Sequence, residues 1–386
     1  MPLYDLTEFL KLSSVLNYNL SAASLNRYNV LLFILEDKRL HANEKQDRRY
    51  KSIIMEALGF LFGAYSQKRR RLGPMAVIHP IRAAALYCRA VPRIGPINLL
   101  TALFHDVLED IHPGKFENSL WKEMESELFA ILKRLGPHNE QRLTENMLHL
   151  TRLETESYYE YIGRLLDHCE DSTELVQIKL ADRLDNTLDM RIDLRDPLEG
   201  SDFFQTIFQI LFVPNYQPRN NEPHPTTSTV LNGARRLYQL FKNAVLLSLV
   251  RRRIDPRSAR SFRALFDAVA TASLREAQRT LLHLIRHHQT DIGQQRTLFF
   301  EAMEYCYRGR IDLVTKPDSR YLLDGLFSTY FAFAGKKELG QRLDLLYQNK
   351  PLMLEASIAF ITIFLSFLND ERFYVRGISA KGIEPK

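Results

Sequence analysis

ALFHDVLEDI, residues 102–111, places four ionisable side chains in the middle of an apolar helical pattern. The four are His105, Asp106, Glu109 and Asp110. Burying such groups without a partner is costly, so something must compensate for them. Residues four apart share a face of a continuous helix, which would set His105 over Glu109 and Asp106 over Asp110. A divalent cation there would offset the desolvation, whereas the plainer interpretation is a polar strip on a half-exposed helix.

Two other segments carry side chains of the same kind. VIHPIRAAALYC places His79 directly before Pro80, which suits the first turn of a helix, so we expect the imidazole at a helix start. VQIKLADRLDNTLDMR places Asp182 in an amphipathic helix. Polar residues at the next positions on the same side of that helix are Asp185, Asn186 and Asp189. Taken alone, a single histidine is more often a cap or a surface residue, and a polar helix face is more often solvated.

Together, His79, the pair His105 and Asp106, and the distal Asp182 give the order H…HD…D. This order resembles the HD-domain superfamily of metal-dependent phosphohydrolases, in which these four residues ligate a divalent metal. The resemblance implies an HD-domain helical bundle that holds one metal ion. Imidazole and carboxylate ligands suit Mn²⁺, Fe²⁺ or Zn²⁺. Such a metal can polarise a phosphoryl oxygen and lower the pKa of bound water.

One branch of that superfamily is more similar still: the hydrolase domain of the Rel/Spo-type alarmone enzymes and the small stand-alone alarmone hydrolases. The segments that carry this similarity are HP at His79, HDVLED at 105–110, LTR…SYYEYI at 150–162 and KLADRLDN at 179–186. The resemblance covers about residues 51–195 and implies that the metal is Mn²⁺. It also implies that Glu109 and Asp110 orient or deprotonate the attacking water. The plainer alternative is that these two acids add negative charge to a solvated helix.

Substrate contacts are expected from a basic loop and from two helices. The run KRRR at residues 68–71 lies just before His79, and guanidinium groups match phosphate oxygens bidentately. The resemblance places Arg70 on the family's loop arginine, although its neighbours depart from the family's Ser-Gly-Glu-Pro-Tyr stretch. Asn186 matches the family's nucleotide-contacting asparagine, whereas Asp185 stands where the long enzymes commonly have histidine and receives no role. Helical side chains that could line the same pocket are Tyr158 and Arg164.

Composition narrows the class of protein. The 386 residues are 45% hydrophobic and 25% charged, which is ordinary for a globular protein of two or three domains. The apolar run at residues 356–368 is too short to cross a bilayer and predicts a buried helix. The N-terminus lacks the pattern of a secretory signal, and three scattered cysteines fit a reducing compartment better than a disulfide framework. We therefore expect a cytoplasmic protein that does not span a membrane.

Apolar residues recur three and four apart along most of the chain, which predicts an all-α fold. The stretch VPNYQPRNNEPHPTTST at residues 213–229 is rich in turn-forming residues and predicts a domain boundary. The expected parts are an N-terminal helical extension at 1–50, an HD phosphohydrolase domain at 51–200, a connecting helix and linker at 201–229, and a C-terminal helical accessory domain at 230–386.

The resemblance implies a Mn²⁺-dependent hydrolase that removes pyrophosphate from the ribose 3′ position of guanosine tetra- or pentaphosphate and leaves GDP or GTP. An HD phosphohydrolase that acts on an adenosine alarmone, a deoxynucleoside triphosphate or a cyclic dinucleotide is an open alternative. The net charge of +6 and the basic stretch at residues 251–263 support another, a non-catalytic regulator that binds nucleotide or nucleic acid. Such a regulator would have no use for Glu109 and Asp110, so nucleic acid is the less favoured partner. A homo-oligomer or a protein partner would use the C-terminal helices.

Overall fold

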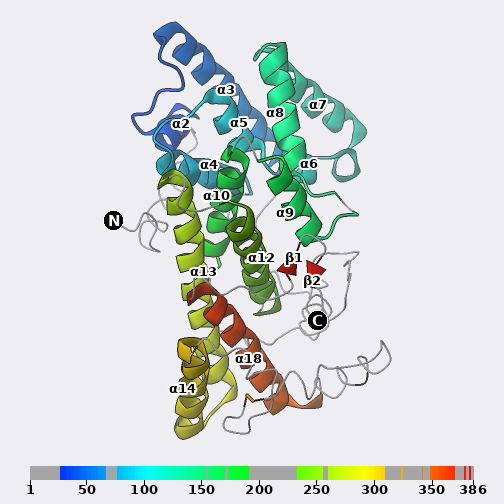
Figure 1. Cartoon of the computed structure of the whole chain (residues 1–386). Helices are drawn as coiled ribbons and strands as arrows, with labels where there is room; N and C mark the ends of the chain where they lie inside the picture. The colour runs from blue at the N-terminus through cyan, green and yellow to red at the C-terminus, as the bar shows by residue number, and fades with distance from the viewer. Residues whose placement is uncertain are drawn as a thin grey trace. The chain divides into compact units, whose positions relative to one another are not determined.

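The computed structural model describes residues 27–66, 76–153, 155–169, 173–190, 233–254, 260–308, 323–324, 341, 348–369, 378–379 and 382–383. These residues form helices together with one pair of two-residue strands, so the expected all-α class is confirmed (Figure 1). The chain divides into two compact units. The first comprises Met1–Glu154, Tyr161–Asp189 and Arg253–Val269, and the second comprises Thr155–Glu160, Met190–Arg252 and Ala270–Lys386.

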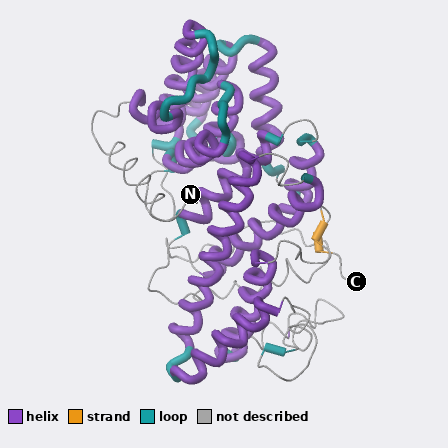
Figure 2. Tube along the Cα trace, turned by 60° about the vertical axis from the view of Figure 1, so that its left-hand side comes forward, coloured by secondary structure: helices purple, strands orange, loops and turns teal. Residues whose placement is uncertain are grey.

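The helices of the first unit supply the candidate site. They are α2 (Arg27–Leu35), α3 (Glu44–Ala64), α4 (Ile78–Ala90), α5 (Pro96–Phe104), α6 (Val107–Asp110), the 3-10 turn η1 (Pro113–Lys115), α7 (Asn118–Lys133), α8 (Pro137–Leu150) and α10 (Glu174–Leu188). Three of the described helices contribute residues to both units: α9 (Tyr158–Asp167), α12 (Gly233–Arg253), whose last residue belongs to the first unit, and α13 (Arg260–His288). The remaining elements are α14 (Ile292–Arg308), α18 (Lys350–Asn369), β1 (Ile378–Ser379) and β2 (Gly382–Ile383). The two strands pair antiparallel, with Ile378 opposite Ile383, and strands are coloured orange and helices purple in Figure 2.

The centre of the first unit is α4, in which every side chain from Ile78 to Cys88 is buried. It packs against α10, α5 and α2, and Figure 1 shows α4, α5 and α10 close together. The three consecutive alanines at 83–85 present little bulk, so neighbouring helices can approach closely. This packing brings the first turn of α4 beside the middle of α10.

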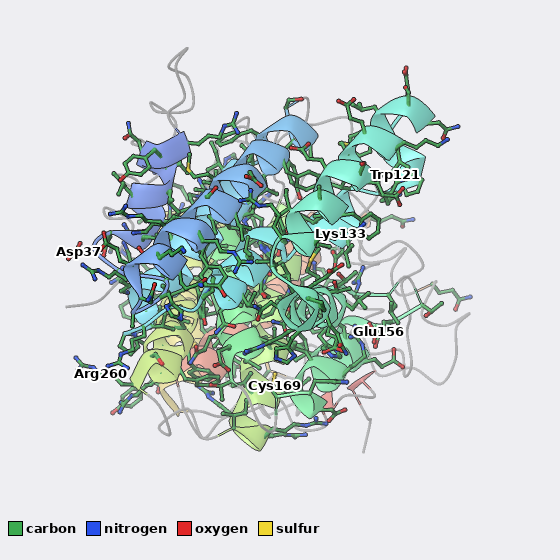
Figure 3. The ribbon with its side chains drawn as sticks, turned by 90° about the horizontal axis from the view of Figure 1, so that it is seen from above. Asp37, Trp121, Lys133, Glu156, Cys169 and Arg260 are labelled. Atoms are coloured by element: carbon green, nitrogen blue, oxygen red, sulfur yellow. The ribbon has the colours of Figure 1, made fainter. Side chains whose placement is uncertain are left out.

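Outside this centre, α8 packs on α5, and α7 packs on both α3 and α8. Figure 3 shows Trp121 and Lys133 towards opposite ends of α7. Local signals explain where these helices begin. The Asn43 side chain caps α3 by accepting a hydrogen bond from the Gln46 N–H at 3.1 Å. Gly136, with φ of 84°, adopts the left-handed conformation that glycine tolerates directly before α8.

The helix predicted through residues 102–111 is interrupted, and the expectation of one continuous helix is wrong. α5 ends at Phe104, α6 begins at Val107, and His105 and Asp106 form the turn between them. Asp106 has φ −105° and ψ 0°, outside the helical region. Consecutive side chains on a helix point about 100° apart, whereas this turn lets two neighbouring side chains face the same point. The apolar period alone could not reveal the break, because the residues on both sides of it keep their helical spacing.

The apolar run at residues 356–368 lies in α18, as expected. Its buried side chains include Ala356, Ile358, Ala359, Ile361 and Leu365. Within the described part of the chain, no helix combines the length and the apolar character needed to cross a membrane.

The linker predicted at 201–229 lies outside the described residues. The segment Arg253–Val269, which the sequence assigns to the accessory domain at 230–386, belongs to the first compact unit. Within that unit the Gln177 side-chain amide donates a hydrogen bond to the Ser261 hydroxyl at 3.3 Å. The four-part organisation stays a prediction.

Truncation of a core leucine should destabilise the first unit. Leu100 of α5 is fully buried, so Leu100→Ala should lower the free energy of unfolding by about 2–5 kcal/mol through lost transfer energy and a residual cavity. Leu148→Ala on α8 is the control, because the Leu148 side chain is 53% exposed. Chemical denaturation followed by circular dichroism would measure both variants. Equal shifts in the two would contradict the assignment of α5 to the core.

Candidate metal centre

Four side chains from three parts of the first unit converge on one point. His79 lies in the first turn of α4, as its place before Pro80 predicts. His105 and Asp106 lie in the turn between α5 and α6, and Asp182 lies in α10. One nitrogen or oxygen atom from each side chain lies within 4.8 Å of the other three. The structure therefore brings together the four residues that the sequence singles out as metal ligands.

The individual distances are short. His79 Nε2 lies 3.2 Å from Asp106 Oδ2, 3.1 Å from Asp182 Oδ1 and 3.2 Å from His105 Nε2. His105 Nε2 lies 3.2 Å from Asp106 Oδ2 and 3.7 Å from Asp182 Oδ1. The histidines and Asp182 are buried, while Asp106 keeps 26% of its side chain exposed. Solvent can therefore reach the cluster from the Asp106 side.

The partners of the two imidazole rings identify which nitrogen faces the cluster as a lone pair. An ionised carboxylate can only accept hydrogen bonds, and Asp185 also accepts from Arg82, so His79 Nδ1 is the donor in its 2.6 Å contact with Asp185. His105 Nδ1 likewise donates to the Ala102 carbonyl at 2.8 Å. In the neutral ring, the proton on Nδ1 leaves Nε2 as a lone pair. Two such lone pairs and two carboxylate oxygens therefore point at one centre, which is the donor set of a divalent cation.

Asp182 is fixed by contacts on both of its carboxylate oxygens. Oδ1 accepts a hydrogen bond from the Asn186 side-chain amide at 2.6 Å, and Oδ2 lies 2.8 Å from Lys179 Nζ. Lys179 and Asn186 lie three and four residues from Asp182, on opposite sides along α10. The lysine balances one of the negative charges of the cluster and directs the other oxygen toward the histidines.

A buried network behind His79 was missed by the sequence interpretation, which gave Asp185 no role. Asp185 accepts from His79 and also from Arg82 Nε at 2.6 Å. Arg82 in turn pairs with Asp189 at 3.2 Å. The helical spacing did set Asp182, Asp185 and Asp189 on one side of α10, and that regular row of acids was the available signal. Arg82 carried no such signal, because it sits among alanines.

Opposite charges set the protonation of this cluster. Burial works against the imidazolium form, but Asp106 and Asp182 raise the pKa of His105 well above its usual range. Burial also works against the ionised carboxylates, but Lys179 and the two histidines hold the pKa of Asp182 well below its usual range. The same is true of Asp106, whose pKa is lowered well below its usual range chiefly by His105. The negative charge of the two carboxylates therefore favours a cation at the centre, either a proton on His105 or a metal ion.

Glu109 and Asp110 follow the cluster in α6, and each is held from another segment. Glu109 Oε1 accepts a hydrogen bond from the Arg152 backbone N–H at 2.7 Å. Loss of solvation and the nearby Asp106 raise the pKa of Glu109, although part of its side chain is open to solvent. A raised pKa brings a carboxylate closer to the range in which it exchanges protons at neutral pH. The Tyr65 hydroxyl, buried at the end of α3, donates to Asp110 Oδ2 at 3.0 Å.

The predicted substrate residues have different placements. Asn186 lies at the cluster through its bond to Asp182. Arg164 of α9 donates to the Thr151 carbonyl at 2.8 Å, and its guanidinium lies 5.6 Å from the Tyr161 ring. Arg70 lies outside the described residues. The Arg164 guanidinium thus ties α9 to the end of α8, a structural contact that the sequence did not predict.

Tyr158, the remaining predicted substrate residue, opens α9 and belongs to the second unit. Its side chain is buried, and Lys242 Nζ lies 5.7 Å from the centre of its ring. A lysine at this distance from an aromatic face makes a cation–π contact.

Residues 77–187 match the family model of the HD domain. The matched segment begins just before His79 and ends just after Asp182, so it contains the whole convergent cluster. Comparisons with curated proteins and with solved structures returned no match. The match of this segment supports a relation to the HD superfamily of metal-dependent phosphohydrolases. It supports a phosphohydrolase that binds a divalent metal.

The donor set agrees with that assignment. Two imidazole nitrogens and two carboxylate oxygens form a mixed set that transition-metal ions such as Mn²⁺, Fe²⁺ and Zn²⁺ accept. Both histidines donate their other ring nitrogen to an acceptor, as metal-bound histidines commonly do. His79, His105, Asp106 and Asp182 would therefore hold the ion.

Loss of one ligand should release the metal. His105→Ala and Asp182→Ala should each lower the affinity for Mn²⁺ by at least about 10–100-fold. That is the loss typically seen when a residue that only hydrogen-bonds to a metal ligand is replaced. Elemental analysis after gel filtration, with Mn²⁺ titration of the stripped protein, measures the effect. His138→Ala in α8 is the matched control, because His138 is exposed. Full metal occupancy in both ligand variants would contradict the site.

Proposed function

We propose that this chain is a Mn²⁺-dependent hydrolase that removes pyrophosphate from the 3′ position of guanosine tetra- or pentaphosphate. The observation that carries the proposal is the convergence of His79, His105, Asp106 and Asp182, with Glu109 and Asp110 directly after them in α6. A set of ligands alone would serve a metal-binding protein of any kind. The two acids beside the ligands give the site a group that can take a proton from water.

The chemistry of the site divides between the ion and the protein. A divalent metal polarises a phosphoryl oxygen and lowers the pKa of water that it binds. Glu109, with its raised pKa, accepts the proton of the attacking water. Water adds to the phosphorus attached to the ribose 3′ oxygen, that P–O bond breaks, and the 3′ oxygen leaves with a proton. The products are GDP or GTP and pyrophosphate.

Asp110 has a supporting part in this scheme. Its Oδ2 accepts from the Tyr65 hydroxyl. Burial and the Asp110 charge raise the pKa of Tyr65 well above its usual range, so the phenol keeps its proton and its hydrogen bond. Asp110 is thereby held in one orientation beside Glu109, where it would align the water.

The guanosine assignment is supported by the resemblance of HDVLED at 105–110 and KLADRLDN at 179–186 to alarmone hydrolases. Asn186, the residue that matches the family's nucleotide-contacting asparagine, lies against Asp182. A nucleotide whose phosphate bound the metal would pass close to this amide. Arg70 remains part of the proposal as a phosphate ligand on the strength of that resemblance.

A panel of nucleotides tests the substrate. The purified protein, with Mn²⁺, should convert guanosine tetraphosphate to GDP and pyrophosphate, which ion-exchange chromatography resolves. Guanosine pentaphosphate should give GTP. The comparison set contains the adenosine alarmone, dGTP and a cyclic dinucleotide, because each tests a different branch of HD chemistry. Faster turnover of any of these nucleotides would overturn the guanosine assignment but leave the assignment as a phosphohydrolase intact. Metal binding without turnover of any nucleotide would favour a non-catalytic regulator.

Replacement of Glu109 should separate catalysis from metal binding. In Glu109→Gln the amide oxygen can still accept from the Arg152 N–H, so the local structure should survive, but the group can no longer take a proton. The rate should fall by roughly two to four orders of magnitude, the range typical of general acid–base groups. Metal content should stay near wild type.

Glu125→Gln, on the exposed face of α7, is the matched control for that change. Asp110→Asn and the double variant complete the set, since effects of groups that act together need not add. Near-normal turnover of the double variant would contradict the proposed mechanism. Metal loss in Glu109→Gln would make Glu109 a ligand instead.

A further inference from the structure

A network of buried charges joins α4 to α10 behind the candidate metal centre. Its members are Arg82, Asp185 and Asp189, whose side chains are 1%, 0% and 3% exposed. A buried charge is strongly destabilising when its partner is missing, and a buried ion pair is often no more stable than apolar packing. Stability alone therefore does not explain why three charged side chains are buried here.

The geometry of Asp185 indicates a further purpose. Oδ1 lies 2.6 Å from Arg82 Nε, so the guanidinium anchors this oxygen. Oδ2 receives both Arg82 Nη2 at 3.2 Å and His79 Nδ1 at 2.6 Å. Arg82 Nη2 reaches on to Asp189 at 3.2 Å. The arginine thus fixes the plane of the Asp185 carboxylate and aims its second oxygen at His79.

We propose that Asp185, held in place by Arg82, is a positioning residue that keeps the His79 proton on Nδ1 and so presents Nε2 to the metal. The inference rests on the metal role of His79 in the proposed function.

The substitution Asp185→Asn probes the idea sharply, because an amide has the shape of a carboxylate but only one oxygen. If that oxygen faces Arg82 Nε, the NH₂ group faces His79 Nδ1 and can bond only to an imidazole that has moved its proton to Nε2. If the oxygen faces His79, the NH₂ group opposes the Arg82 donor. Either arrangement weakens the metal-binding form of the ring.

Asp189→Asn is the matched control. Asp189 is also buried, directly follows α10 and pairs with the same arginine, whereas the 2.6 Å contact with His79 Nδ1 is made by Asp185. Mn²⁺ alone is titrated into the metal-free, full-length protein in competition with a chromophoric chelator. Asp185→Asn should lower the Mn²⁺ affinity by about 10–100-fold, and Asp189→Asn should leave it close to wild type. Chemical unfolding of the metal-free variants compares their loss of stability.

A second measurement uses the wild-type protein and does not depend on the variant folding. In protein labelled with ¹⁵N-histidine and loaded with diamagnetic Zn²⁺, His79 should carry its proton on Nδ1, protected from exchange by its bond to Asp185. The His79→Gln variant identifies the signal by its loss. A His79 ring without a proton on Nδ1 would overturn the inference.

The titrations also separate this inference from the proposed function. Wild-type Mn²⁺ affinity in His79→Gln would remove His79 from the metal site, and both proposals for that residue would fail. Weaker binding in His79→Gln, with equal affinities in Asp185→Asn and Asp189→Asn, would overturn the positioning role alone and leave the metal site standing.

Discussion

The packing of α4 against α10 buries charged side chains of both helices. A buried charge is strongly destabilising unless it is paired, so these side chains have to pair with one another. Arg82 of α4 meets Asp185 and Asp189 of α10, and His79 meets Asp182 and Asp185. Two basic side chains of α4 thus lie against three acids in or directly after α10. The pairing requires one particular register of the two helices, since a slip along either axis would leave buried charges unpaired.

That register places the remaining parts of the site. With His79 fixed opposite Asp182, the break between α5 and α6 has to deliver two more ligands to the same point. A continuous helix would turn His105 and Asp106 away from each other, and the turn brings both toward His79. The His105 ring is then tied back to α5 through its bond to the Ala102 carbonyl. The four converging side chains are therefore held by α4, by α10 and by the turn between α5 and α6, and a site built on the scaffold helices is positioned more precisely than one on loops.

The acids of α6 are held by other segments of the first unit. Glu109 is bonded to the backbone of Arg152, and Asp110 to the Tyr65 hydroxyl at the end of α3. Both contacts join residues more than forty positions apart in the chain. Loss of solvation and the nearby charge of Asp106 raise the pKa of Glu109, whereas the bond from the Arg152 N–H lowers it.

The sequence by itself determined the helical class and singled out the four side chains that converge in the structure, because helical periodicity and residue chemistry are local properties that can be read from short segments. It also placed His79 in a first helical turn and put Asp182, Asp185 and Asn186 on one side of a helix. Tertiary structure alone decided the break at His105, the part played by Asp185 and the importance of Arg82. These features depend on contacts across about a hundred residues of chain, such as the Arg82–Asp185 pair with a separation of 103. The sequence does not distinguish an ionisable side chain that faces water from one that pairs with a buried partner. For these residues, the packing of α4 on α10 determines which of the two occurs.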